Sequence, residues 1–164
     1  MDLFVLRHGK AGQASPDTDD IMRALTSPGR REIRIIARWM RREGIEFDVI
    51  ASSPLIRASE TAGIVARMLD QKDKLVMWDD LAPGGDFDSI CYHAAQEKNN
   101  AAVLIVGHEP DLSILIGKII SGVGPASIIL AKGGLAKIKN FSYTTKPSGE
   151  LQWLLTPKQI LSMK

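Results

Sequence analysis

Residues 3–9 read LFVLRHG: four apolar side chains in a row are followed by Arg7, His8 and Gly9. A short apolar run that stops at turn-forming residues is typical of a strand buried on both faces, as in a parallel sheet. In open parallel sheets, ligands bind beyond the carboxyl ends of the strands. The stretch therefore predicts a strand that delivers Arg7 and His8 to a ligand site.

Apolar runs and helical patterns alternate along the rest of the chain. Residues 29–43 show the 3.6-residue apolar period of an amphipathic helix, and Gly44 ends it. We expect further strands at 47–51, 75–78, 102–106, 127–130, 135–138 and 151–155, and further helices at 53–69, 87–98 and from Pro110 to about Ile120. This order predicts an α/β fold with a mostly parallel sheet, and the late strands are expected as its antiparallel edge.

Length and composition set limits on the class of protein. A chain of 164 residues with 45% hydrophobic and 24% charged residues is expected to form a single globular domain. A net charge of +2 gives no indication of a nucleic-acid or membrane partner. The single cysteine, Cys91, excludes an intramolecular disulfide. Since no signal peptide or long apolar run is visible, we expect a cytoplasmic protein.

Two other predicted strands end in residues that can bind phosphate. The strand at 102–106 leads to His108, and the strand at 47–51 leads to Ser53, a candidate helix cap, with Arg57 in the next helical turn. If these strands are parallel neighbours, two imidazoles and two guanidinium groups meet beside helix N-termini, which favour anions. Arginine forks match phosphate oxygens, and an imidazole can act as a nucleophile.

Simpler alternatives remain for each residue. Histidines at strand ends are often only structural, and arginines in a first helical turn often form solvated ion pairs. A zinc site at His8 and His108 is a further alternative. However, the sequence has no HxxxH or CxxC spacing, and Arg7 would repel a cation.

The same residues resemble the histidine phosphatase (phosphoglycerate mutase-like) superfamily. The resemblance runs through about Gly134 and is carried by RHG at 7–9, SPLIRA at 53–58 with ETA at 60–62, and GHEP at 107–110. RALT at 23–26 with Gly29, and LAPGGD at 81–86, are similar to the SixA-type phosphohistidine phosphatases in particular. One departure is Ala24, where that branch usually has proline.

The resemblance implies one histidine phosphatase domain over residues 1–164, with a three-layer α/β/α sandwich. It implies that His8 is the nucleophile, that Arg7, Arg57 and His108 bind the phosphate, and that neither a metal nor another cofactor is needed. The arginine matching Arg23 can reach the phosphate in the SixA-type pattern. In this chain Asp19 or Asp20 could instead hold Arg23 in a surface ion pair.

The resemblance leaves the general acid and the substrate open. Relatives that cleave phosphate monoesters carry an acid after the third strand, and Asp79, Asp80 and Asp86 lie there without a clear match. Loss of a strong acid is compatible with cleavage of phosphohistidine, whose imidazole departs readily. We therefore expect a phosphatase that acts on phosphohistidine in a signalling protein. The alternatives are a phosphatase of small phosphomonoesters and a non-catalytic phosphoprotein-binding module.

One further pattern has no place in this scheme. Arg30, Arg34, Arg38 and Arg41 form a basic stripe on the helix predicted at 29–43. Such a stripe is usually a solvated helix face, although it could also meet an acidic partner or nucleic acid. Because no aromatic residues alternate with the arginines, we expect no nucleic-acid binding.

Overall fold

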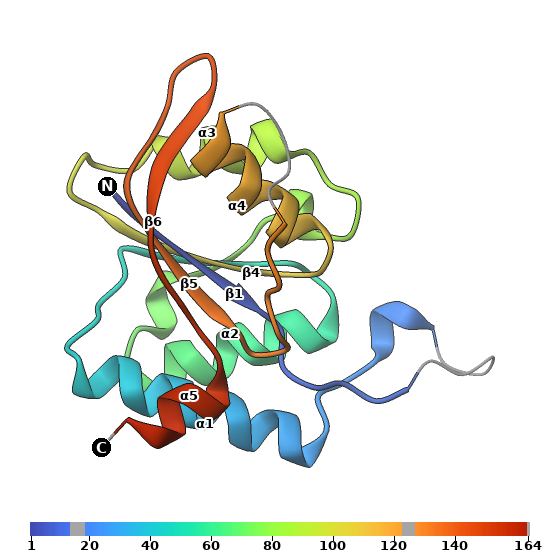
Figure 1. Cartoon of the computed structure of the whole chain (residues 1–164). Coiled ribbons are helices and arrows are strands. Elements are labelled where there is room, and N and C mark those ends of the chain that lie inside the picture. Colours follow the sequence, from blue (N-terminus) through green and yellow to red (C-terminus); the bar gives the residue numbers. More distant parts are fainter. Residues whose placement is uncertain (14–18, 123–126, 164) are drawn as a thin grey trace.

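The computed structural model describes residues 1–13, 19–122 and 127–163. A six-stranded sheet forms its centre, with the strand order β3-β2-β4-β1-β5-β6 (Figure 1). The strands are β1 (Asp2–Arg7), β2 (Val49–Ser52), β3 (Leu75–Met77), β4 (Ala102–Gly107), β5 (Leu135–Tyr143) and β6 (Pro147–Leu155). The first four pair in parallel, whereas β5 and β6 are antiparallel. The predicted parallel sheet with antiparallel strands at one edge is therefore confirmed.

Helices cover both faces of the sheet. They are α1 (Ser27–Arg42), α2 (Ile56–Met68), α3 (Phe87–Ala95), α4 (Asp111–Ser121) and α5 (Pro157–Ser162), with short 3₁₀ helices η1 (Asp20–Met22), η2 (Lys72–Lys74) and η3 (Asp79–Leu81). Figure 1 shows α1, α2 and α5 on one side of the sheet and α3 and α4 on the other. The predicted three-layer α/β/α fold is confirmed. Among the described residues, no helix is both long and apolar enough to cross a membrane.

Strand β1 shows why the sheet is buried on both faces. Its side chains point alternately to opposite faces. Phe4 and Leu6 belong to the core beneath α1 and α2, and Leu3 and Val5 belong to the core beneath α3 and α4. The parallel register aligns Arg7 with Gly107. The candidate site residues that follow these strands therefore lie together beyond the carboxyl ends of the parallel strands.

Helix α1 follows the expected pattern. The Thr26 side chain accepts a hydrogen bond from the Gly29 amide, and a proline lies in the first helical positions. Ile33, Ile36 and Met40 are fully buried on its inner face. Gly44 follows the helix with a φ of 65°, a conformation that glycine adopts without strain.

Two local expectations were wrong, and one helix was not predicted. No strand forms at 127–130: Leu130 is buried, but its carbonyl accepts a hydrogen bond from the Arg7 side chain instead of from a neighbouring strand. Ser53 does not cap α2, which begins at Ile56 and has no side-chain cap. Helix α5 was not predicted, although Thr156 and Gln159 form a capping box, which is a sequence signal for the start of a helix. The sequence also predicts a polar loop from Lys10 to Asp20, of which residues 14–18 lie outside the described part of the chain.

Gly29 allows α1 to approach the segment that follows His8. A Cβ atom built on Gly29 would lie 2.1 Å from the backbone oxygen of Lys10. The same oxygen accepts hydrogen bonds from the backbone and the hydroxyl of Thr26. The first turn of α1 and the segment after His8 thus fit together only because this position has no side chain.

We predict that Gly29→Ala destabilises the protein by about 1–3 kcal/mol, because the added methyl group forces α1 away from Lys10. The matched control is Gly63→Ala in α2, where a Cβ atom meets nothing within 4 Å. Alanine favours helix over glycine, so this control should gain about 0.5–1 kcal/mol. Urea unfolding of both variants checks the pair, and equal stabilities would contradict the close approach.

Candidate phosphate site

His8 lies directly after β1 and is held by backbone groups. Its amide donates to the carbonyl of Gly107 at 3.1 Å, and its Nδ1 is 2.7 Å from the carbonyl oxygen of Gly9. A carbonyl oxygen can only accept, so Nδ1 carries the ring proton. In the neutral ring, Nε2 then holds the free lone pair that a nucleophile needs.

The surroundings of His8 keep its ring neutral. The side chain lies in a site where the residue is only 7% exposed. Burial, followed by the charges of Arg57, Arg7 and Lys132, lowers the pKa of His8 from 6.5 to about 4, although the hydrogen bond to Gly9 opposes the shift. His8 is therefore unprotonated at neutral pH, as nucleophilic attack requires.

His108 lies beside His8, with 5.0 Å between the ring centroids. It follows β4, is 3% exposed, and places Nε2 2.8 Å from the hydroxyl oxygen of Ser53. Burial and the charges of His8 and Arg57 lower the pKa of His108 to about 3, so this ring is neutral too. Ser53 accepts a hydrogen bond from the amide of Leu55, and its own proton can be donated to Nε2.

When Ser53 donates to Nε2, the ring proton of neutral His108 lies on Nδ1, which is then a donor. Among the described residues Nδ1 is buried and has no hydrogen-bond partner. Nε of Arg7 is the second such buried donor; the Nη1 group of Arg7 donates to the carbonyl of Leu130 at 2.9 Å. Buried donors without partners are rare in proteins. Two of them at the same strand ends fit an anion that carries several acceptor oxygens.

Arg57 and Arg23 are joined by Asp20. Arg57 is 5% exposed and donates from Nη1 to the backbone oxygen of Asp20 at 2.7 Å and from Nη2 to its carboxylate at 2.9 Å. Arg23 donates to the other carboxylate oxygen at 2.6 Å and from Nε to the carbonyl of Gly12. Hydrogen bonds from Arg23 and then Arg57 hold the pKa of Asp20 below its usual value. Asp20, one of the two partners foreseen for Arg23, thus places Arg23 next to Arg57.

The motif residues after Arg57 explain how the segments are held together. The hydroxyl of Thr61 donates to the carbonyl of Arg57 at 2.7 Å and accepts from the amide of Gly9 at 3.2 Å. Glu60 accepts from the amide of Leu25 at 2.7 Å and forms an ion pair with Arg30 at 2.6 Å. The second turn of α2 therefore fixes the turn after His8 and the segment before α1.

The sequence analysis missed the roles of Ser53 and Thr61. Ser53 precedes a proline, the usual signal of a helix cap, and only the distance to His108 shows its different role. Thr61 lies one helical turn after Arg57, and this spacing lets its hydroxyl reach the Arg57 carbonyl. The spacing is visible in the sequence, but the partner from Gly9 is not.

The three aspartates considered as general acids lie in or after η3. Asp86 caps α3, and hydrogen bonds from the amide of Asp88 and the hydroxyl of Ser89 hold the pKa of Asp86 low. In the described part of the chain, no hydrogen bond or ion pair joins Asp79, Asp80 or Asp86 to the histidines or arginines of the site. None of these contacts assigns one of the three aspartates as the general acid.

The described residues provide no set of ligands for a metal ion. Among residues 1–13, 19–122 and 127–163, no three histidine, cysteine or acidic side chains are grouped so that they could hold a metal ion. The two guanidinium groups whose charges act on His8 would also repel a cation. The zinc alternative is therefore poorly supported by the geometry.

Known proteins resemble this chain over nearly its whole length. It is 26% identical over 159 residues to phosphohistidine phosphatase SixA of Escherichia coli K12, covering 96% of this chain and 94% of that protein. A solved structure of the protein histidine phosphatase SixA complexed with tungstate matches with a TM-score of 0.83 at 25% identity, covering 96% and 98% of the two chains. Phosphoserine phosphatase of Entamoeba histolytica has the same fold, with a TM-score of 0.69 at 15% identity over 96% and 98%.

The family model and the motifs agree. Residues 3–83 match the model of the histidine phosphatase superfamily (branch 1), and this range includes β1, the segment around Arg23 and the start of α2. The expected similarity to SixA-type proteins is confirmed by the sequence and structure comparisons. Together they support phosphatase activity, and the chain is similar to the histidine phosphatase superfamily in sequence and in fold.

Proposed function

We propose that the protein is a phosphatase that carries the phosphoryl group on Nε2 of His8 during turnover, and that its substrate is phosphohistidine in a signalling protein. The hydrogen bond from Nδ1 of His8 to the Gly9 carbonyl carries the proposal, because it leaves the lone pair on Nε2. The likeness to phosphohistidine phosphatase SixA supports this substrate class.

In this proposal the substrate phosphate lies among the donors that have no protein partner. Nε of Arg7 and Nδ1 of His108 bind two of its oxygens. The guanidinium of Arg57, still bonded to Asp20 on one side, binds a third with its remaining N–H groups. Arg23 adds positive charge from the far side of Asp20. Charge develops on these oxygens in the transition state, so preorganised cations lower the barrier.

The first chemical step transfers the phosphoryl group. The lone pair on Nε2 of His8 forms a bond to phosphorus, and the bond from phosphorus to the substrate nitrogen breaks. The departing imidazole keeps that electron pair and leaves neutral if its other nitrogen is already protonated. In the second step, water attacks phosphorus, the bond to His8 breaks, and inorganic phosphate is released. No step requires a metal.

The leaving group explains why this site suits phosphohistidine. An imidazole departs without a proton donor, whereas an alkoxide from a serine-like ester must be protonated as the bond breaks. Among the candidate acids, Asp86 is engaged as the cap of α3, and Asp79 is exposed. The site therefore offers several charged donors to the phosphoryl oxygens, but no assigned proton donor to the leaving group.

We predict that brief exposure to ³²P-labelled aryl phosphate places label on His8 as an acid-labile, alkali-stable phosphoramidate. Since the pKa of His8 is about 4, labelling should persist at pH 5 and fail as the pH drops through about 4 and the lone pair is protonated. His8→Ala should abolish both label and turnover, while the control His93→Ala on α3 keeps them. Label on a serine, or turnover by His8→Ala, would contradict the mechanism; absence of any label would favour a binding module.

We predict that Arg57→Ala and Arg7→Ala each lower kcat/KM for an aryl phosphate by about 10²–10³, the usual effect of removing a preorganised charge-stabilising donor. Arg67→Ala, an exposed arginine of the same helix as Arg57, is the matched control and should change kcat/KM by less than about twofold. Treatment with EDTA should have no effect on the wild-type rate. Activity lost to the chelator and restored by zinc would instead support the metal alternative.

We predict a steep fall in rate as the pKa of the leaving group rises. A phosphohistidine peptide and activated aryl phosphates should be hydrolysed, and serine-like alkyl phosphates should react at least about 10²-fold more slowly. Changing Asp79, Asp80 or Asp86 to asparagine should leave phosphohistidine turnover within about tenfold. If one of these variants, still folded, loses activity only on alkyl phosphates, that aspartate is the acid and the phosphomonoesterase alternative is preferred.

A further inference from the structure

The exposed side of α1 carries arginines that the proposed reaction does not use. Helix α1 contains six arginines and one glutamate among its 16 residues. The basic stripe predicted from the sequence is therefore present and extends further than Arg30, Arg34, Arg38 and Arg41. An exposed charged helix face is commonly just solvated. Its ion pairs show whether that explanation is sufficient here.

The arginines of α1 divide into two groups by their partners. Three of them have carboxylates nearby, in the ion pairs Arg30–Glu60, Arg41–Asp70 and Arg42–Glu43. The exposed residues Arg31, Arg34 and Arg38 have no ion pair or side-chain hydrogen bond to any described residue, and neither has Arg67 on α2. We call these four residues the arginine surface.

The spacing on α1 places like charges next to one another. Arg30, Arg34 and Arg38 follow at intervals of four residues, so neighbouring guanidinium groups lie on the same side of the helix and repel. Only Arg30 is compensated, by Glu60. Arg34 and Arg38 have no carboxylate partner among the described residues, and an external anion would relieve their repulsion.

The surface is hollowed along the contact of α1 with α2. One depression of about 290 Å³ is lined by residues that include Arg30, Arg34, Ser59 and Arg67. A second, of about 270 Å³, is lined by Arg31, Arg34, Ile35 and Arg38. Because Arg34 lines both, the two depressions are neighbours on the arginine surface.

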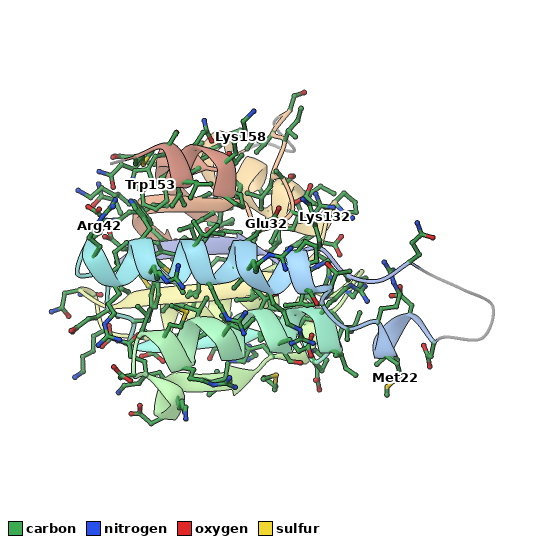
Figure 2. All side chains as sticks on the ribbon, turned by 90° about the horizontal axis from the view of Figure 1, so that it is seen from below. Met22, Glu32, Arg42, Lys132, Trp153 and Lys158 are labelled. Carbon is green, nitrogen blue, oxygen red and sulfur yellow. The ribbon has the colours of Figure 1, made fainter. Side chains whose placement is uncertain are left out.

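The arginine surface begins next to the phosphate site. Figure 2 shows α1 and α2 side by side, with the segment that carries Met22 projecting beyond the same end of both helices. Arg57 lies in the first turn of α2, and Glu60 joins α2 to Arg30 and to Leu25 in front of α1. A segment bound along the arginine surface would therefore lead towards His8.

We propose that the arginine surface binds a carboxylate-rich segment of the phosphorylated substrate protein, next to the phosphoryl group that His8 accepts. The proposal rests on the proposed function and names the kind of protein that the site serves. Guanidinium groups suit it because they pair with carboxylates through two parallel hydrogen bonds. Single-stranded nucleic acid fits less well, since base stacking needs exposed aromatic rings. The one aromatic residue of α1, Trp39, is half-buried and packs on Trp153.

The test uses two synthetic 15-residue peptides with a central phosphohistidine, one flanked by aspartate and glutamate and the other by glutamine and serine. For the wild-type chain we expect the acidic peptide to have about tenfold higher kcat/KM at low salt, mainly through KM. This advantage should vanish near 1 M salt, where charges are screened within about 3 Å. In Arg34→Glu/Arg38→Glu the advantage should be lost or reversed, because the introduced carboxylates repel the peptide.

The controls separate the surface from the active site. Neither Arg34 nor Arg38 has an ion pair or side-chain hydrogen bond to a described residue, so the double variant should fold and should hydrolyse p-nitrophenyl phosphate within about twofold of the wild type. Lys139→Glu/Lys146→Glu makes the same change of charge at exposed positions of β5 and the β5–β6 turn. This control should keep the preference for the acidic peptide. Equal peptide preference in the wild type and in Arg34→Glu/Arg38→Glu would overturn the proposal.

Fluorescence anisotropy with the unphosphorylated acidic peptide distinguishes failure of the two proposals. If neither phosphopeptide is hydrolysed, the proposed substrate is wrong. Peptide binding that is lost in Arg34→Glu/Arg38→Glu still supports an acidic partner, whereas binding that is unchanged overturns the docking surface. A single-stranded oligonucleotide of equal charge serves as the competitor. If it binds about tenfold more tightly than the peptide and depends on the same arginines, the surface is a nucleic-acid site and the proposal fails.

Discussion

Two neutral imidazoles lie beside guanidinium groups in a buried site, and the surrounding residues have to hold the positive charges of these guanidinium groups in place. Burial and the nearby cations lower the pKa of both His8 and His108. The guanidinium groups are positioned by hydrogen bonds within the protein: Arg57 donates to Asp20, and Arg7 donates to the carbonyl of Leu130. Each support uses only part of a guanidinium group, so donors remain for phosphate oxygens.

The backbone provides the precision that this arrangement needs. The register of β1 against β4 places Arg7 opposite Gly107, and the amide of His8 continues the ladder by donating to the Gly107 carbonyl. On the other side, the amide of Gly133 donates to the carbonyls of both Arg7 and His8. The end of β1 is therefore hydrogen-bonded on both sides: to the parallel strand β4 on one side and to the loop at Gly133 on the other. Side chains on such a strand end have little freedom to move.

The sequence was most informative where a structural feature depends only on residues that are close together in the chain. The apolar run of β1, the amphipathic period of α1 and the residues that follow each strand predicted the sheet and the site histidines and arginines. It was least informative where a partner comes from a distant segment. The sequence around Ser53 is typical of a helix cap, and only the structure shows its hydrogen bond with His108. The apolar residues around Leu130 are typical of a strand, but the Leu130 carbonyl accepts a hydrogen bond from the Arg7 side chain. Local signals cannot show such pairings.

The site draws on segments spread over most of the chain, from His8 directly after β1 through Arg57 to Leu130 before β5. No short stretch brings these groups together, so an unfolded or half-folded chain offers a phosphate ion nothing comparable. An oxyanion that binds only the assembled site adds RT ln(1 + [L]/Kd) to the free energy of unfolding, where L is the ion. The phosphate released at the end of each turnover is such an ion. Under the proposed function, the reaction product would thus act as a folding ligand that stabilises the structure which produces it.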